Sequence, residues 1–82
     1  MTTSEYVNMT HAKDFCKRNY DKAHTDTRVF LYREDGCFDF CQEWDYYHGY
    51  GQSIPEQDVY ACVFYGTGGY DEPPAFDVEY YP

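Results

Sequence analysis

TRVFLYREDGCFDFCQEWDY, residues 27 to 46, decides the fold. Two runs rich in β-branched and aromatic residues flank Asp35-Gly36, a pair that favours a two-residue type I′ turn between antiparallel strands. A turn of this length also determines which residues lie opposite each other. The expected cross-strand pairs are Arg33 with Phe38, Tyr32 with Asp39, Leu31 with Phe40, Phe30 with Cys41, Val29 with Gln42 and Arg28 with Glu43. The last pair joins opposite charges, which supports this register.

The register divides the hairpin into two faces, because successive side chains of a strand point to opposite sides. One face is apolar and is expected to join the core; it holds Val29, Leu31, Phe38, Phe40 and Trp44. The other face carries rings and carboxylates; it holds Phe30, Tyr32, Asp39, Cys41, Glu43 and Asp45. A slip of one residue would exchange the two faces, so the expected surface depends on the turn.

The segments on either side of the hairpin supply one helix and two more strands. Thr10 is a suitable N-cap, and apolar residues follow it at helical spacing, which predicts a helix over residues 10–22. Residues 4–9 form either a short edge strand or an irregular arm. The Gly, Pro and polar content of residues 48–58 predicts a loop. GTGGYDEPP, from residue 66 onward, predicts a second loop.

The two later strands differ in pattern. VYACVFY, residues 59–65, is apolar throughout, which is typical of a central strand covered on both faces. FDVEYY, residues 76–81, alternates, so that its two carboxylates point away from its apolar side chains. Together these elements predict a single domain over residues 1–82 of the α+β class. One N-terminal helix packs on a three- or four-stranded, mostly antiparallel sheet.

Charge is distributed unevenly along the chain. The net charge is −9, yet all six basic residues lie within the first 33 positions. Residues 34–82 contain no Lys or Arg, and their acidic residues are Glu34, Asp35, Asp39, Glu43, Asp45, Glu56, Asp58, Asp71, Glu72, Asp77 and Glu79. A surface of one sign repels nucleic acid and anionic lipid and attracts a cationic partner. The alternative explanation is an acidic surface that serves only solubility.

The four cysteines and three histidines do not match a known metal-binding pattern. Cys37 and Cys41 share a strand face but stand about 13 Å apart, and the chain has no Cys-x-x-Cys pair. Buried free thiols in a reducing cytosol are therefore expected. A site that combines Cys16, Cys62 and one hairpin cysteine with a His stays open as an alternative. Because no catalytic Cys or Ser signature is present, neither an enzyme nor a cofactor is expected.

Membranes and nucleic acids are not expected partners either. MTTSEYVNMTHAKDF lacks the apolar segment of a signal peptide, and no run is long enough to cross a membrane. A cytoplasmic protein is therefore expected. The GTGGY segment lacks the Lys of a phosphate-binding loop, and Asp71 and Glu72 would repel phosphate. Direct nucleic-acid binding would need a basic patch, which the sequence does not contain.

The acidic, ring-rich face suggests imitation of a nucleic acid. Side chains on one strand face recur every 6.6 to 6.8 Å or so, and two steps along one DNA strand give about the same rise. Tyr32, Tyr60, Tyr81 and the rings of EWDYYHGYG, residues 43–51, could take the place of stacked bases. The residues predicted to bind a basic, nucleic-acid-handling protein are Asp39, Glu43, Asp45, Tyr46, Tyr47, Asp77 and Glu79.

In size, acidity and composition the chain resembles phage-encoded inhibitors such as anti-CRISPR and anti-restriction proteins. The resemblance implies a partner in the host-cell cytoplasm, with a CRISPR effector complex favoured and a restriction or repair enzyme next. It assigns no individual residue. A different class of function stays open, in which the chain is an adaptor or structural subunit. Its Tyr-rich edge would then bind a homologous chain or an apolar partner, with little dependence on salt.

Overall fold

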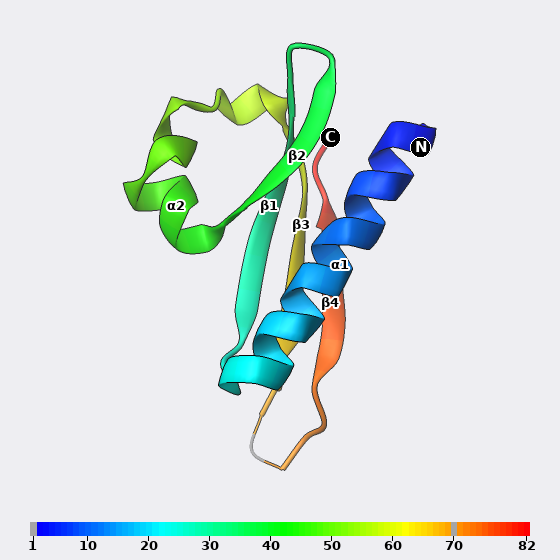
Figure 1. Cartoon of the computed structure of the whole chain (residues 1–82), viewed down its shortest axis with the longest axis vertical. Helices are drawn as coiled ribbons and strands as arrows, with labels where there is room; N and C mark the ends of the chain where they lie inside the picture. Colours follow the sequence, from blue (N-terminus) through cyan, green and yellow to red (C-terminus); the bar gives the residue numbers. More distant parts are fainter. Residues whose placement is uncertain (1, 70) are drawn as a thin grey trace.

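The computed structural model describes residues 2–69 and 71–82 and shows a long helix packed on a four-stranded sheet (Figure 1). The elements in chain order are α1 (Thr3–Ala23), β1 (Thr27–Glu34), β2 (Cys37–Gln42), α2 (Glu43–His48), the 3₁₀ helices η1 (Tyr50–Ser53) and η2 (Glu56–Asp58), β3 (Val59–Gly66) and β4 (Ala75–Tyr80). The strand order is β2-β1-β3-β4, and all neighbours are antiparallel. The predicted α+β class is confirmed. Tyr70, in the predicted loop between β3 and β4, lies outside the described residues.

The hairpin of β1 and β2 forms as predicted. Asp35 and Gly36 both have positive φ angles, 51° and 79°, as a type I′ turn requires. The expected pairs within the ladder are all present, from Arg33 with Phe38 at one end to Val29 with Gln42 at the other. The assignment of hairpin residues to two faces is therefore confirmed as far as β2 extends.

α1 begins earlier than predicted, and its N-cap is Thr2 rather than Thr10. The Thr2 hydroxyl accepts a hydrogen bond from the Glu5 amide at 3.1 Å. The Thr10 hydroxyl instead donates to a carbonyl one turn earlier inside the helix. The prediction failed because the residues before Thr10 extend the buried stripe of the helix. That stripe consists of Asn8, Met9, Ala12 and Cys16.

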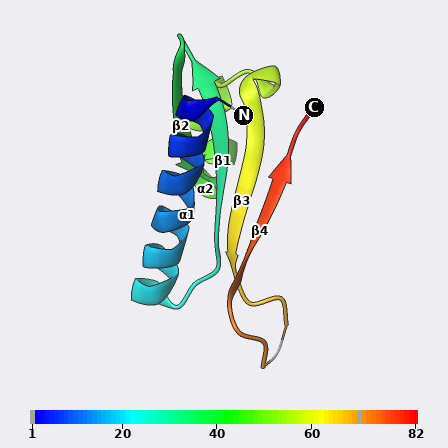
Figure 2. The same cartoon turned by 90° about the vertical axis from the view of Figure 1, so that its right-hand side faces the viewer.

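α1 covers one face of the sheet, called here the helix face (Figure 2). The buried core between them comprises Met9, Ala12, Cys16, Val29, Leu31, Tyr60, Ala61, Val63 and Tyr65. Removing these apolar side chains from water is the main force that holds the helix to the sheet. β4 is the edge strand next to β3, and its Phe76 and Tyr80 remain exposed.

A buried polar group joins α1 to the sheet. The Asn8 side-chain amide donates to the backbone carbonyl of Asp39 at 2.9 Å and to the Tyr60 hydroxyl at 2.8 Å. Tyr60 reaches this position because the pairing of β1 with β3 shifts after Leu31. A β-bulge of this kind adds one residue to a strand and turns its side chain.

The opposite face of the sheet, called here the distal face, has a smaller buried cluster. The cluster comprises Phe30, Tyr32, Cys41, Val59 and Cys62, and it is covered by Tyr46, Ile54 and Tyr81. α2 lies beside β1 and β2 and contacts both strands (Figure 1). β3 is consequently buried on both faces, as its uniformly apolar sequence predicted.

β2 ends at Gln42, and the prediction that the strand continues through residue 46 was wrong. Because β1 begins at Thr27, a longer β2 would have almost no residues left to pair with. The chain instead folds into α2, which stacks the Tyr46 ring on Phe30 at 4.4 Å between centroids. Trp44, which was expected in the core, is therefore 67% exposed.

Candidate protein-binding surface

Five predicted binding residues lie together where β2 meets α2; they are Asp39, Glu43, Asp45, Tyr46 and Tyr47. The expected straight row of three carboxylates along one strand is wrong, because only Asp39 remains in a strand. Residues two apart in a helix point in different directions, so Glu43 and Asp45 diverge. The phosphate-like interval is therefore absent from this edge of the sheet.

Asp39 and Asp45 nevertheless both lie close enough to the buried thiol of Cys41 to influence its pKa. Desolvation raises the pKa of Cys41 to about 11, and the two carboxylates add to this effect. The Asp39 carboxylate also accepts a hydrogen bond from the Phe40 amide at 2.8 Å. Both carboxylates thus belong to one negative region at the β2 edge of the distal face.

The other two predicted residues, Asp77 and Glu79, lie on β4 at the opposite edge of the sheet. Directly paired residues of an antiparallel ladder share a face. Glu79 pairs with Cys62 and Asp77 with Phe64, which places both carboxylates on the distal face. Three strand spacings, about 14 Å, separate them from β2. The distal face thus carries acidic side chains at both edges.

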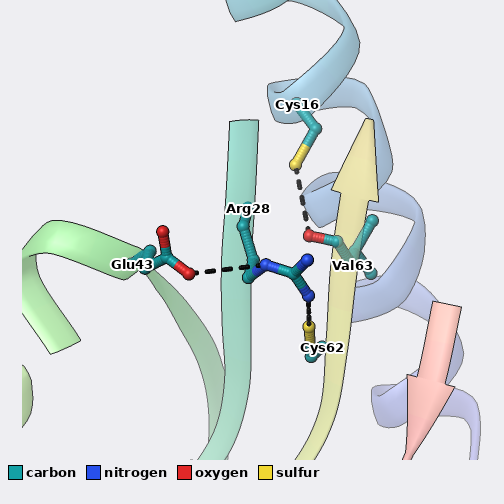
Figure 3. A network of polar contacts seen from close by, with 5 residues as sticks. All are labelled: Cys16, Arg28, Glu43, Cys62 and Val63. Atoms are coloured by element: carbon teal, nitrogen blue, oxygen red, sulfur yellow. Dashed lines mark hydrogen bonds and ion pairs between the residues drawn. The ribbon is translucent and has the colours of Figure 1, made fainter. Parts of the chain in front are cut away.

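Arg28 lies on the distal face, and contacts on several sides hold its guanidinium (Figure 3). Its Nε lies 3.4 Å from the Glu43 carboxylate, and one Nη donates to the Cys62 sulfur at 3.1 Å. The group also lies over the Phe64 ring, 5.1 Å from its centroid. The predicted contact between Arg28 and Glu43 is therefore confirmed, although Glu43 begins a helix rather than extending β2.

The aromatic residues divide into buried and exposed sets. Tyr32 and Tyr60, which were expected to offer rings to a partner, are only 4% and 5% exposed. That expectation is wrong, because Tyr32 packs in the distal cluster and the bulge turns Tyr60 toward α1. The rings that do reach solvent around α2 and η1 are those of Trp44, Tyr47 and Tyr50.

A pocket of about 670 Å³ opens on the distal face next to α2. Its lining residues come from β1, α2, η2, β3 and the end of the chain, and they are Phe30, Tyr46, Tyr47, Glu56, Gln57, Val59, Tyr81 and Pro82. Phe30 and Val59 form a buried apolar floor. This volume falls in the range of roughly 300 to 1,000 Å³ that is usual for ligand pockets.

Burial raises the pKa of two tyrosines that line the pocket. Desolvation, and then the Cys62 thiol, raises the pKa of Tyr81 to about 12. Desolvation and the Glu56 carboxylate raise the pKa of Tyr46. Neutral phenols keep their O–H donors and a ring face that is electron-rich. The pocket wall therefore combines aromatic rings with one carboxylate, that of Glu56.

Several of these lining residues were not predicted from the sequence. Glu56 and Gln57 lie in a segment that the sequence identified only as a loop. Two 3₁₀ turns fold this segment back onto the distal face, where Ile54 packs against the buried cluster. An isolated Ile among polar and Gly residues was the available sign that the loop has a buried anchor.

The cysteines are free thiols. Cys16, Cys41 and Cys62 are buried as predicted, whereas Cys37 is exposed near the hairpin turn and contradicts that prediction. Desolvation raises the pKa of Cys16 to about 12, so this thiol is protonated and a poor metal ligand. Within residues 2–69 and 71–82, no three His, Cys, Asp or Glu side chains are grouped so as to hold a metal ion.

Fold and surface together define a small acidic α+β domain with carboxylates and rings on one sheet face. Among the described residues, no helix has the length and apolar character needed to cross a membrane. No model of a known protein family, no curated protein and no solved structure matches this chain.

Proposed function

We propose that this protein is a small acidic inhibitor that binds a basic, nucleic-acid-handling protein complex and blocks its nucleic-acid site by charge mimicry. A CRISPR effector is the favoured target, and a restriction or repair enzyme is the next. The protein acts in the cytoplasm, which is that of the host cell if a phage encodes it. It performs no catalysis and uses no cofactor.

Segregation of charge is the observation that carries this proposal. Four of the six basic residues lie on α1, and Arg33 points to the helix face, where its guanidinium lies over the Tyr60 ring. Arg28 is held by Glu43 on the distal face. The carboxylates of Asp39, Asp45, Asp77 and Glu79 surround a surface without a free cation among the described residues. Such a one-sided field attracts a basic groove and speeds association with it.

The β4 edge supplies the best support for mimicry of a phosphate backbone. Asp77 and Glu79 are two residues apart on one strand and point to the same face. Their spacing of about 6.6 to 6.8 Å is close to the rise of two phosphates along one DNA strand, about 6.8 Å. Arg side chains that normally bind two such phosphates can pair with two carboxylates at this interval.

Charge reversal at each edge of the distal face tests the proposal. One variant carries Asp39→Lys and Asp45→Lys, and the other carries Asp77→Lys and Glu79→Lys. We expect each to weaken binding to a purified CRISPR effector complex at least about tenfold, because several desolvated charge pairs are lost. Binding of the wild-type chain should also weaken with salt and be competed by target DNA.

A matched control has the same change of charge on the far side of the molecule. Asp14→Lys with Asp21→Lys alters two exposed carboxylates of α1 and should leave binding within about twofold of wild type. Circular dichroism melts verify that all three variants fold. Equal affinity of wild type and both distal-face variants, against every nucleic-acid-binding target tested, would contradict the proposal.

The exposed rings favour one second candidate, the adaptor that binds an apolar partner. Trp44 and Tyr50 are 67% and 58% exposed on the surface of α2 and η1. Exposed large rings of this kind are enriched at protein interfaces. An adaptor would lose affinity on Trp44→Ala and would bind equally well at low and high salt, whereas the inhibitor is sensitive to salt.

A further inference from the structure

The pocket on the distal face has two aromatic walls that meet at nearly a right angle. The Tyr46 ring is stacked on Phe30 with an angle of 26° between planes. The Tyr47 ring stands at 71° to Tyr46 and at 82° to Phe30. Tyr47 is 53% exposed, so its ring extends the wall toward solvent. A ligand in this corner would contact two rings at once.

The charge of the pocket selects the ligand. Glu56 lines it, and among the described residues none of those that line the pocket is basic. Aromatic faces attract cations, and a carboxylate attracts them further, whereas both repel a phosphate. Arg28 also presents a guanidinium on this face, but Glu43, Cys62 and Phe64 already hold it.

The protein itself shows how such a surface binds arginine. Arg28 has Phe64 beneath its guanidinium and Glu43 beside it. Arg33 lies 4.6 Å from the centroid of Tyr60 and 3.5 Å from the Glu5 carboxylate. Each arginine of the sheet is thus held by one ring and one carboxylate. The pocket offers the same two groups on a solvent-accessible surface.

We infer that this pocket binds an arginine side chain of the protein partner, with its guanidinium against the rings of Tyr46 and Tyr47 and paired with Glu56. Arginine is favoured over lysine because the planar guanidinium stacks on a ring and forms two parallel bonds to a carboxylate. The apolar floor of Phe30 and Val59 accommodates the methylene stem. The inference rests on the proposed function only for the source of the arginine.

Binding of a free probe tests the pocket without the partner. N-acetyl-arginine methylamide is titrated into the isotope-labelled protein, and NMR signals of Tyr46, Tyr47 and Gln57 are followed. We expect saturable shifts confined to the pocket. The citrulline analogue has the same length and planar head group without the charge, and it should bind at least about fivefold more weakly. Equal binding of the citrulline or lysine analogue would overturn the assignment to arginine.

Variants connect the shifts to the named groups. Glu56→Gln and Tyr47→Ala should each lower affinity for the arginine probe about fivefold or more, through loss of the carboxylate or of one wall. Glu34→Gln makes the same chemical change as Glu56→Gln at an exposed site in the hairpin and should leave the affinity unchanged. If Glu56→Gln binds as well as wild type, the pocket does not recognise arginine through this carboxylate, and the inference fails.

The two proposals can fail separately. If the probe binds in the pocket but the charge-reversed chains still bind the effector complex, the pocket is correct and the inhibitor proposal is wrong. If charge reversal abolishes binding to the effector complex while the probe shows no saturable shift, the inhibitor proposal stands and the arginine site is wrong.

Discussion

The helix face and the distal face are built from the same strands but are covered differently. A single helix of 21 residues lies along the helix face and encloses a continuous core. The distal face is covered by a six-residue helix, two 3₁₀ turns and the end of the chain, and its buried cluster is smaller. The first arrangement excludes water from nearly everything it covers, and the second leaves a pocket.

This difference separates the main core, which stabilises the fold, from the proposed binding surface on the other side of the same sheet. Alternate residues of β1 point to opposite faces, so Leu31 anchors α1 while its neighbour Phe30 forms the floor of the pocket. Short elements with few buried contacts open locally at lower cost than the main core does. The distal face can therefore adjust locally without disturbing the packing of α1.

Truncation of one side chain on each face should give the largest contrast. Leu31→Ala removes a side chain that is 0% exposed and should lower the free energy of unfolding by about 2 to 5 kcal/mol. Tyr47→Ala removes an exposed ring from the distal face and should lower it by less than about 1 kcal/mol. Urea titrations followed by circular dichroism measure both. Equal losses would show that the distal face contributes as much to stability as the helix face.

The sequence predicts the part of the fold that local chemistry determines. Asp35-Gly36 is sufficient to specify the hairpin turn and its register, and the uniformly apolar β3 is sufficient to place that strand in the centre. α2 was missed because its stability comes from a contact between Tyr46 and Phe30, which are far apart along the chain. No local pattern in EWDYYH separates that outcome from a longer strand.

In the candidate site, too, the features set by local sequence were predicted and those set by long-range contacts were not. Asp77 and Glu79 were placed on the correct face because their strand alternates strictly. The pocket was not predicted, since Glu56 reaches it only after two 3₁₀ turns bring a polar segment back to the sheet. The position of this segment depends on the packing of Ile54 against the buried cluster and on the residue at which α2 ends. Residue spacing in the sequence encodes neither.

Alkaline pH should weaken the distal face through its buried phenols. Desolvation, followed by the Asp39 carboxylate, raises the pKa of Tyr32 from 10.0 to about 12. Since the folded state retains this proton while the unfolded state loses it, the stabilising contribution is complete below about pH 10 and is lost as the pH rises to about 12. Tyr32→Phe has no phenol to ionise, so it does not lose stability in this way. Between neutral pH and about pH 11, its free energy of unfolding should therefore rise by about 1 kcal/mol relative to that of wild type.

Urea titrations of wild type and Tyr32→Phe at neutral and alkaline pH measure this effect. Phe retains the buried ring, so the difference between the two proteins at neutral pH serves as the baseline. If that difference stays constant between neutral pH and about pH 12, the Tyr32 phenol does not contribute to alkaline unfolding.

The smallest expected change in stability comes from substituting either of two arginines. Each contacts a carboxylate, but their surroundings differ. Arg18 lies 2.9 Å from Asp14 on α1, and both side chains are more than half exposed. Arg28 is farther from its carboxylate, at 3.4 Å, but it also contacts a buried sulfur and an aromatic ring. Arg18→Gln should therefore lower stability by less than about 0.5 kcal/mol, and Arg28→Gln by roughly 0.5 to 1 kcal/mol.

The salt dependence of the stability loss distinguishes Arg18→Gln from Arg28→Gln more clearly than the size of the loss does. At about 1 M salt the screening length is near 3 Å, so the effect of Arg18→Gln should disappear while most of the effect of Arg28→Gln remains. Ring and sulfur contacts are short-ranged, and the ions of the solvent do not reach between the groups that make them. If high salt removed both effects equally, Arg28 would be bound by its charge alone. The distal face would then hold this arginine no more firmly than the exposed surface of α1 holds Arg18.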